Sequence, residues 1–552
     1  MIMKNLFNVG KSISIMLLCG VIITSCKQSA EKTEEETFDY EAMVNRYAVV
    51  EMEADLSHLS ENELKIVSIM FEIADIMDEL FWIQAYGDKQ ELLDGIEDEN
   101  AKKFAIINYG PWDKLGNNQS FIDGYGEKPA GANFYPADMT REEFEAWDNP
   151  VKSSLYTMIR RNENGQLQAI WYKDFFKEKI EKAAGLLKKA AAFAKDIGLK
   201  NYLHSRAKAL LTDEYFESDL AWMDMKTSNI DFIVGPIENY EDGMFGYKAA
   251  YETFILIKDL EWSALLTRFA AMLPDLQKGL PVAQKYKKEI PGVDSDINVY
   301  QAIYYAGDCN AGAKSIAINL PNDEKVHIKK GTRKLQLKNS MQAKFDKILC
   351  PVSDILIAEE QRKHIKFDAF FENVMFHEIA HGMGIKNTIN GKGTVRNALK
   401  ETYSAIEEAK ADIMGLYLIS ELYKNGEMTE GELMDNFVTF VAGIFRSCRF
   451  GAASAHGKAN MMRFNYFTEH SAIERRDDGT YFVHFDKMHN AMISSVQQIL
   501  TIQGDGNYEL AKKVIEETGI ITETLQNDLN LIEKNNIPVD IVFVQGKEKV
   551  GL

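Results

Sequence analysis

The chain contains few cysteines: only 5 of its 552 residues. Two of them, Cys19 and Cys26, lie in the N-terminal segment, which leaves Cys309, Cys350 and Cys448 in the remainder. An odd, widely spaced set of three gives no basis for a disulfide framework. It also lacks the close pairs that hold structural zinc. The sequence therefore predicts neither a disulfide scaffold nor a cysteine metal site.

An excess of positive charge is also missing. The chain has 63 Lys and Arg against 83 Asp and Glu, a formal net charge of −20. Removing the three lysines of residues 1–30 leaves −23 for the rest. A body of this charge, without a basic stripe, repels nucleic acid and anionic lipid headgroups. Neither is expected as a partner.

The apolar run at residues 12–25 is too short to span a bilayer. It follows two lysines, and the first thirty residues contain no acidic residue, which is typical of a bacterial export signal. The run ends in Ile-Thr-Ser-Cys26, which resembles a lipobox. We expect Cys26 to carry lipid and residues 27–37 to be a disordered tether. The chain would then be a lipid-anchored lipoprotein of the bacterial cell envelope, in the periplasm or on the outer membrane. The alternative is a plain secretory signal with an incidental cysteine.

Apolar spacing and turn residues predict the order of elements along the chain. We find no internal repeat, and no low-complexity stretch beyond the tether. The expected elements are helices within 38–105 and 172–197, packed loops at 106–150, strands at 230–237 and 314–320, weaker strands at 481–485 and 540–544, and mostly helix from 367.

The run FHEIAHGMG places His377 and His381 four residues apart, so that both imidazoles face the same side of a helix. Two such histidines can bind one zinc ion, and Glu378 between them then faces the metal's water. The alternative is a pair of surface histidines on an ordinary helix. A third ligand decides between these readings.

A second helix, expected to begin near Asn397, carries the run EEAKAD. Its periodicity places Glu408 and Asp412 on one face, and we take Glu408 as the third zinc ligand. Histidines that bind zinc usually donate their other ring N–H to a carboxylate, and Glu407 and Asp412 are placed to accept it. Read alone, this acidic run would be a solvated helix face. Together with His377 and His381 it predicts one zinc ion per chain.

With these motifs, the chain resembles the dipeptidyl peptidase III family of zinc exopeptidases. The run EEAKADIMGLYL is similar to that family's zinc-ligand motif. GPIENYEDGMFG resembles the strand in which a glutamate holds the substrate's amino terminus and a tyrosine stabilises the transition state, which implies these roles for Glu238 and Tyr240. A carboxylate is also the expected partner of an ammonium group.

Three further positions follow from the same resemblance. IAINLPND resembles the family's loop with two asparagines that bind the substrate backbone, here Asn319 and Asn322. Asparagine suits that role because its amide both donates and accepts hydrogen bonds. SAHGKANMMRF resembles the segment with a histidine near the scissile carbonyl, here His456, and Glu252 occupies the place of another acidic residue near the cleft.

The resemblance implies an α+β, mainly helical fold with two lobes separated by a wide cleft: a helical zinc lobe and a mixed lobe with a small β-barrel. The family generally has one more residue in its zinc motif and a longer connection to the Glu-Glu run, so we expect a regular helix through this site. The expected division is a signal at 1–25, a tether at 26–37, the mixed lobe with the substrate strand at 38–257, the helical lobe at 258–304, the mixed lobe again at 305–350, the helical zinc lobe at 351–530 and a C-terminal segment of the mixed lobe at 531–552.

The function expected from these residues is zinc-dependent release of dipeptides from the N-terminus of oligopeptides. Glu378 is the base, Tyr240 and His456 stabilise the oxyanion, and Glu238 fixes the distance from the free terminus. One alternative is an endopeptidase of the thermolysin kind, which has no terminus to hold. Another is a non-catalytic, peptide-binding lipoprotein. The oligomeric state stays open.

Overall fold

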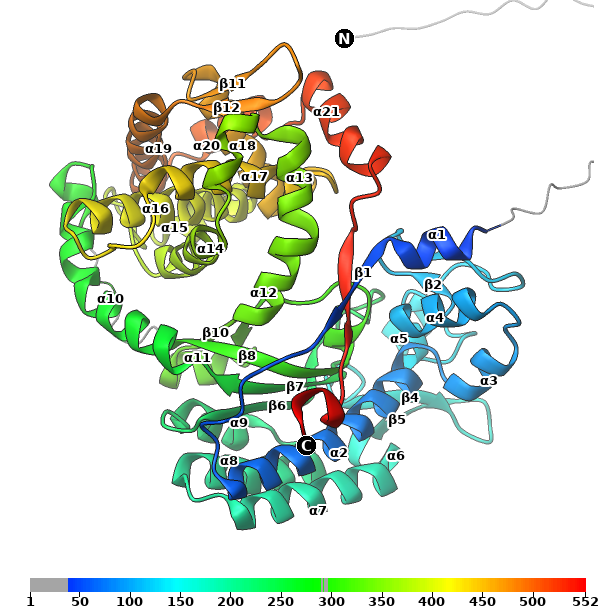
Figure 1. The fold of residues 1–552 in the computed structure, drawn as a ribbon. Coiled ribbons are helices and arrows are strands. Elements are labelled where there is room, and N and C mark those ends of the chain that lie inside the picture. The colour runs from blue at the N-terminus through cyan, green and yellow to red at the C-terminus, as the bar shows by residue number, and fades with distance from the viewer. Residues whose placement is uncertain (1–37, 289–290, 292–295) are drawn as a thin grey trace, which may run out of the picture. The chain divides into compact units, whose positions relative to one another are not determined.

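Residues 40–552 contain two groups of elements, one built on a curled sheet and one made almost entirely of helices (Figure 1). The computed structural model describes residues 38–288, 291 and 296–552. The expected signal, lipidated Cys26 and tether lie outside the described residues. Among the helices within the described ranges, none combines the length and apolar character needed to cross a membrane.

The sheet has five strands in the order β6-β7-β8-β10-β9. All neighbours are antiparallel except β8 and β10, which run parallel. Strands at 230–237 and 314–320 are confirmed, whereas the sequence did not single out the other three. β7 is buried at almost every position, so it lacks the alternation that marks a half-exposed strand. The strands are β6 (Ile230–Glu238), β7 (Ala250–Lys258), β8 (Asp296–Gly307), β9 (Ala317–Leu320) and β10 (Arg333–Leu337).

The sheet curls strongly but does not close. Arg333 on β10 and Asp231 on β6 form an ion pair of 2.9 Å with both side chains almost fully buried, although their strands are not neighbours. The edge strands β6 and β9 do not pair with each other among the described residues. The small β-barrel expected from the resemblance is therefore wrong in this detail: a curled open sheet stands in its place. The mainly helical, mixed fold is confirmed.

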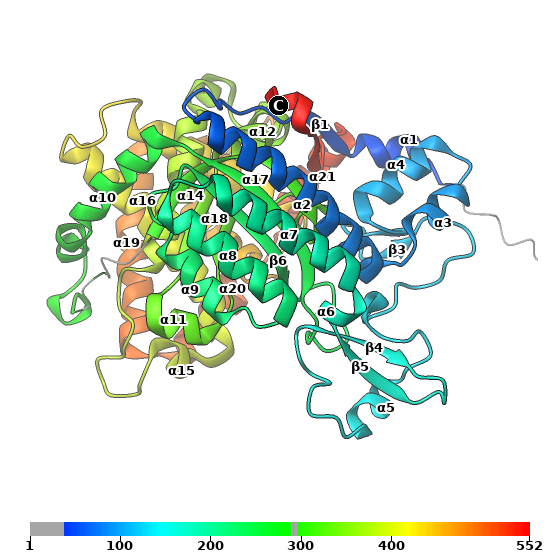
Figure 2. The same cartoon turned by 90° about the horizontal axis from the view of Figure 1, so that it is seen from below.

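Helices cover one side of this sheet, where α2, α7 and α8 lie side by side (Figure 2). Their helix α2 begins with a capping box in which Ser60 and Glu63 satisfy each other's backbone N–H. Segment 106–150 has little regular structure, but its aromatic side chains Trp112, Phe121 and Phe134 are buried, so the expected packed loops are confirmed. The helices here are α1 (Tyr40–Asn45), α2 (Glu61–Ala85), α3 (Lys89–Asp94), α4 (Glu99–Asn108), α5 (Arg141–Ala146), α6 (Tyr172–Phe175), α7 (Lys177–Phe193), α8 (Ile197–Thr212), α9 (Phe216–Asp224) and α11 (Glu324–Lys330), with hairpins β2 (Trp112–Asp113) to β3 (Gln119–Ser120) and β4 (Thr157–Arg161) to β5 (Leu167–Trp171).

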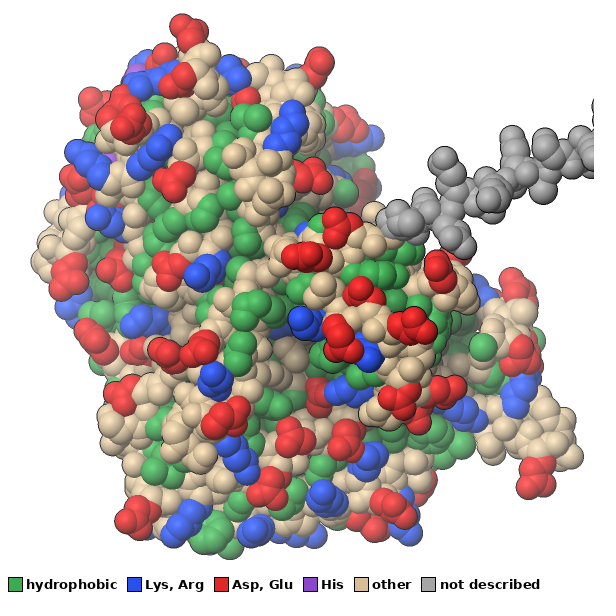
Figure 3. Space-filling model, turned by 45° about the vertical axis from the view of Figure 1, so that its right-hand side comes forward, with side chains coloured by type: hydrophobic (Ala, Val, Ile, Leu, Met, Phe, Trp, Pro, Cys, Tyr) green, Lys and Arg blue, Asp and Glu red, His purple; other side chains and the backbone are tan. Residues whose placement is uncertain are grey.

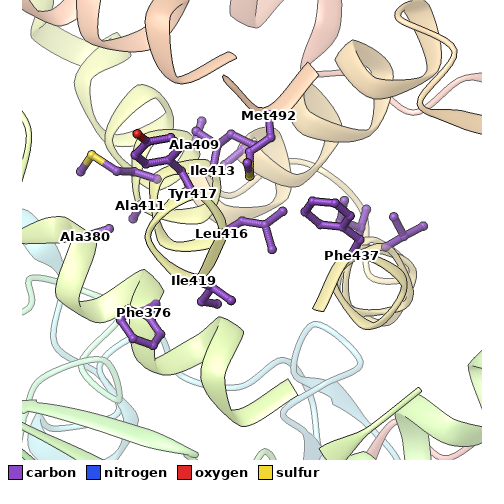
Figure 4. Close-up of a cluster of buried hydrophobic side chains, with 14 of the residues drawn as sticks. Phe376, Ala380, Ala409, Ala411, Ile413, Leu416, Tyr417, Ile419, Phe437 and Met492 are labelled. Atoms are coloured by element: carbon purple, nitrogen blue, oxygen red, sulfur yellow. The ribbon is translucent and has the colours of Figure 1, made fainter. Parts of the chain in front are cut away.

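The second group is built around α16, which is buried along most of its length. Figure 4 shows α16 side chains such as Leu416 directed toward Phe437 of α17 and Met492 of α19, with Phe376 and Ala380 of α14 on another side. The elements are α10 (Leu260–Gly279), α12 (Lys338–Lys344), α13 (Cys350–Leu356), α14 (Phe367–His381), α15 (Val395–Leu399), α16 (Tyr403–Lys424), α17 (Leu433–Cys448), α18 (Ala455–Glu469), β11 (Ile473–Arg475), β12 (Tyr481–Val483), α19 (Phe485–Asp505), α20 (Tyr508–Thr518) and α21 (Glu523–Lys534).

The ends of the described chain meet in a parallel pair, β1 (Tyr47–Glu51) with β13 (Asp540–Val544) (Figure 1). The pairing confirms the weak strand expected at 540–544, whereas β1 was expected to be helical. The expected lobe boundary at residue 304 falls inside β8, which continues to Gly307. The division into lobes by residue number stays a prediction.

Acidic and basic side chains are interspersed on the face shown in Figure 3, and no broad basic area is visible there. Polyanions bind through clusters of Lys and Arg. This face offers no such cluster.

Gly415 lets α16 approach the backbone of α14. A Cβ at this position would lie 2.8 Å from the backbone N of His377 and 2.9 Å from the carbonyl carbon of Phe376. We expect Gly415→Ala to lower the free energy of unfolding by about 2 to 3 kcal/mol, because the helices must move apart. Gly185→Ala is the control: Gly185 has open space around its Cα, so alanine should stabilise by about 0.5 to 1 kcal/mol. Urea unfolding measures both, and equal effects of the two substitutions would contradict the close approach.

Candidate active site

His377 and His381 lie on the face of α14 that is not buried in the core. The opposite face packs inward through Phe370, Phe371, Met375, Phe376 and Ile379. The helix is α-helical without interruption to His381, the regular form expected from the five-residue motif. Across from it, Glu408 extends from the central helix α16.

The three side chains converge on one point. Nε2 of His377 lies 3.2 Å from Nε2 of His381 and 3.3 Å from Oε2 of Glu408, and the remaining side of the triangle is 3.6 Å. Ligand atoms around tetrahedral zinc, at bonds of 2.0 to 2.1 Å, are separated by about 3.4 Å. The donor set therefore has the dimensions of a zinc site.

Two carboxylates fix both imidazoles. Nδ1–H of His377 donates to Asp412 at 2.7 Å, and Nδ1–H of His381 donates to Glu407 at 3.0 Å. Each Nε2 therefore presents its lone pair toward the other and toward Glu408, an arrangement that is repulsive without a cation. Glu408 Oε2 is itself buried and has no hydrogen-bond partner of acceptable geometry among the described residues. These observations fit a bound metal cation.

The electrostatics of the group point the same way. Burial lowers the pKa of the His377 imidazole, but the neighbouring carboxylates of Asp412 and Glu408 outweigh burial and raise it to about 10. Burial by itself raises the pKa of the Glu408 carboxyl, but the two histidines outweigh burial and lower this pKa far below its ordinary value. The cluster thus attracts positive charge strongly, and a divalent metal satisfies that demand.

The sequence did not identify two residues that hold Glu407. Lys410 lies 2.7 Å from one of its carboxylate oxygens, and Gln503 on α19 donates to the other at 2.9 Å. Burial raises the pKa of Glu407, but Lys410 and His381 lower it to about 2, so the carboxylate stays ionised. Lys410 lies within the EEAKAD run, whereas nothing in the sequence marks Gln503.

Asp412→Asn should weaken zinc binding by about 10- to 100-fold, because the amide does not hold the His377 ring as the carboxylate does. Competition with a chromophoric chelator measures the affinity. The control is Asp354→Asn on the exposed side of α13, which should leave the affinity unchanged. Unchanged zinc affinity in Asp412→Asn would show that the contact with His377 does not orient a ligand.

A second group, His364, Glu432 and Asp435, also brings three possible ligand atoms together. Here Asp435 accepts hydrogen bonds from His364 at 2.7 Å and from the backbone N–H of Glu432. Glu432 and Asp435 form the capping box of α17. Because these contacts already account for the cluster, His377, His381 and Glu408 are the stronger candidates for metal ligands.

Glu378 lies beside His377, His381 and Glu408 and contacts a lysine from the sheet. Nζ of Lys334 on β10 is 3.1 Å from Glu378 Oε2 and donates to the backbone carbonyl of Glu378 at 2.7 Å. Burial raises the pKa of the Glu378 carboxyl, but Lys334 and the two histidines lower it below its ordinary value. An ionised carboxylate is the form that accepts a proton.

His456, at the start of α18, lies close to the same group. Its Nδ1 is 3.2 Å from Glu408 Oε2, and its side chain is 67 % exposed. Its ring centre is 6.1 Å from that of His377. The structure therefore places His456 beside the expected metal position with one side open to solvent.

The remaining predicted residues lie on strands of the sheet or within two residues of a strand end. The amide of Asn322 approaches the end of β6, donating to the carbonyl of Ile237 at 3.4 Å, and neighbours Glu238. Burial raises the pKa of the Glu238 carboxyl, and the Asn322 side chain lowers it in part. Glu252, on the neighbouring strand β7, is fully buried, and burial together with Asp308 and Glu238 holds its pKa well above the ordinary value.

Tyr240 and Asn319 are open to solvent. Tyr240 is 82 % exposed and borders a polar cavity of about 770 Å³. Asn319 on β9 lies directly opposite Lys334 on β10. Cross-strand partners share one face of a sheet, so Asn319 faces the side from which Lys334 reaches Glu378.

Comparison with known proteins places these features in a family. The model described as Peptidase family M49 matches residues 146–396, from before the Glu238 strand to beyond His381. A solved structure of DPP III from Caldithrix abyssi has 40 % identity over 92 % of this chain and 99 % of its own, with a TM-score of 0.87. A dipeptidyl-peptidase III structure from Corallococcus sp. strain EGB has 35 % identity over 91 % and 96 %, with a TM-score of 0.74.

Among curated proteins, the chain is 36 % identical to a protein of Arabidopsis thaliana named Nudix hydrolase 3, over 92 % of this chain and 74 % of that protein. That name belongs to the plant protein and assigns no activity to this chain. The family model and both structures agree with the expected resemblance, which is confirmed. The chain belongs to peptidase family M49, the dipeptidyl peptidase III family of metallopeptidases.

Proposed function

We propose that this protein is a zinc-dependent exopeptidase that releases dipeptides from the N-terminus of oligopeptides. The observation that carries the proposal is the convergence of His377, His381 and Glu408 within 3.2 to 3.6 Å, with Glu378 beside them. When bound there, zinc supplies a Lewis acid and acidifies a water molecule. The Glu378 carboxylate then accepts the water's proton and passes it to the leaving amine nitrogen.

The sheet group supplies the substrate contacts. β9 is an edge strand, and its outer backbone groups have no strand partner among the described residues, so they can pair with an extended peptide. Asn319 and Asn322 offer amide donors and acceptors to the peptide backbone. Glu238, at the end of β6, pairs with the substrate's ammonium group. This pairing sets how far the first residues extend toward the metal.

Two hydrogen-bond donors complete the proposed reaction. His456 lies beside the proposed metal position, and Tyr240, in the turn after β6, is exposed to solvent. Both donate to the oxyanion in our proposal, a role that typically contributes about 3 kcal/mol to the barrier for each donor. Tyr240 reaches it when the two groups of elements close on substrate.

We further propose that Cys26 carries lipid and holds the enzyme at the cell envelope. The support is the export-type segment and lipobox of residues 12–26 in the sequence. Metabolic labelling with a palmitate analogue tests this proposal, and labelling that persists in Cys26→Ser would contradict it.

Peptide cleavage separates the proposed exopeptidase from its alternatives. The protein is incubated with matched peptides bearing free or acetylated N-termini, with and without a chelator, and the products are identified by mass spectrometry. We expect dipeptides from free peptides only, and none after chelation. Internal cuts in acetylated peptides would favour the endopeptidase, whereas no metal-dependent cleavage would favour the non-catalytic binder.

A further inference from the structure

Lys334 connects the sheet to the proposed base Glu378. It lies on β10 of the sheet, while Glu378 lies on α14 of the helical group. Both side chains are largely shielded, with 16 % and 21 % exposed. One ammonium group contacts two parts of the same residue, the carboxylate at 3.1 Å and the backbone carbonyl at 2.7 Å. Two contacts restrict the rotamer of Glu378 more than one would.

The carbonyl contact also meets a need of the helix. α14 ends at His381, so the carbonyl of Glu378 is one of the last four in the helix. The backbone N–H of Gly382 bonds to Ile379 and Ala380 instead. Lys334 thus supplies a donor that the helix lacks, from a strand 44 residues earlier in the chain.

Lys334 is at the same time the cross-strand neighbour of Asn319. Side chains directly opposite each other in an antiparallel pair project from the same face and lie about 5 Å apart at Cβ. A peptide backbone held by Asn319 therefore lies next to the lysine that holds the base. While the contact between Lys334 and Glu378 is intact, β9 and β10 cannot shift relative to α14 without moving Glu378 as well. Without the contact, the bound peptide and Glu378 can move independently.

We propose that Lys334 is a positioning residue that fixes the Glu378 carboxylate relative to the edge strand β9, on which Asn319 lies. The proposal rests on the proposed peptidase function. It assigns Lys334 an effect on the chemical step and little effect on peptide binding, because Asn319, Asn322 and Glu238 stay in place. A purely structural helix cap would instead change stability without a selective effect on turnover.

The kinetic test compares Lys334→Met, Lys334→Arg and the control Lys208→Met. Lys208 is exposed on α8, so its variant has the same charge change away from the site. We expect kcat of Lys334→Met to fall by about 100-fold, the effect of a misplacement of about 1 Å, with KM changed less than about threefold. Arginine keeps the charge and donors and should restore kcat to within about tenfold of the wild type. A kcat within twofold of the wild type in Lys334→Met, or an equal loss in the arginine variant, would overturn the proposal.

A second measurement does not depend on activity. The melting temperatures of Lys334→Met, Glu378→Ala and the double variant form a cycle. The proposed contact predicts that the double variant loses clearly less than the sum of the two single shifts. Additive shifts would show that the side chains are uncoupled. If the wild type releases no dipeptides, the proposed function fails, while this cycle still tests the contact.

Discussion

Glu378→Gln is expected to lower kcat by about 10⁴-fold while zinc stays bound. Glutamine has nearly the same shape and can still accept a hydrogen bond from Lys334, but its amide cannot take a proton from water. The proposed zinc ligands His377, His381 and Glu408 are untouched. Turnover should therefore be lost without loss of the metal.

Elemental analysis gives the zinc content and a coupled peptide assay gives kcat. Glu469→Gln, at the exposed end of α18, is the matched control and should behave as the wild type. A Glu378→Gln protein that keeps more than a tenth of the wild-type kcat would contradict the role of Glu378. Loss of zinc from this variant would mean that the carboxylate supports the metal site and not the proton transfer.

Glu238→Gln is expected to lower kcat/KM for peptides with a free N-terminus by about 100-fold or more. Removing one partner of a shielded charge pair typically costs 2 to 5 kcal/mol, about 30- to 4,000-fold in affinity. The selectivity for free over acetylated peptides should shrink by the same factor. That selectivity distinguishes an ammonium anchor from a general weakening of the site.

The same carboxylate gives a pH dependence. Burial raises the pKa of the Glu238 carboxyl, so on acidification it becomes neutral at a higher pH than an ordinary glutamate. KM for free peptides should therefore rise as the pH falls through this raised pKa, and that rise should be absent in Glu238→Gln. Glu217→Gln, exposed on α9, is the control. A wild-type pH profile of KM in the Glu238 variant would exclude the assignment.

Local patterns predicted the helical part of the site well. The four-residue spacing of His377 and His381 and the periodicity around Glu408 both follow from helix geometry, and the structure brings these residues together. The second helix was expected near Asn397, whereas α16 begins at Tyr403 after the short helix α15. The imidazoles of His377 and His381 meet the Glu408 carboxylate because α14 packs closely on α16, an approach that Gly415 permits.

Contacts between distant segments were beyond the sequence. Three strands of the sheet, β7, β8 and β10, were not singled out, and a strand that is not recognised cannot place its side chains. The contact between Lys334 and Glu378 was missed for this reason, because the two residues are 44 positions apart and no motif marks Lys334. The barrel expected from the resemblance was wrong for a similar reason, since pairing of the edge strands depends on the curvature of the whole sheet.

The most direct test of the proposed function is the mass of the first product released from a free-terminus octapeptide while most of the substrate remains. We expect the dipeptide of residues 1 and 2, whatever the order of residues in the peptide, and no product from the acetylated octapeptide or after zinc is removed. A single amino acid, an internal fragment, or equal cleavage of the acetylated peptide would contradict it.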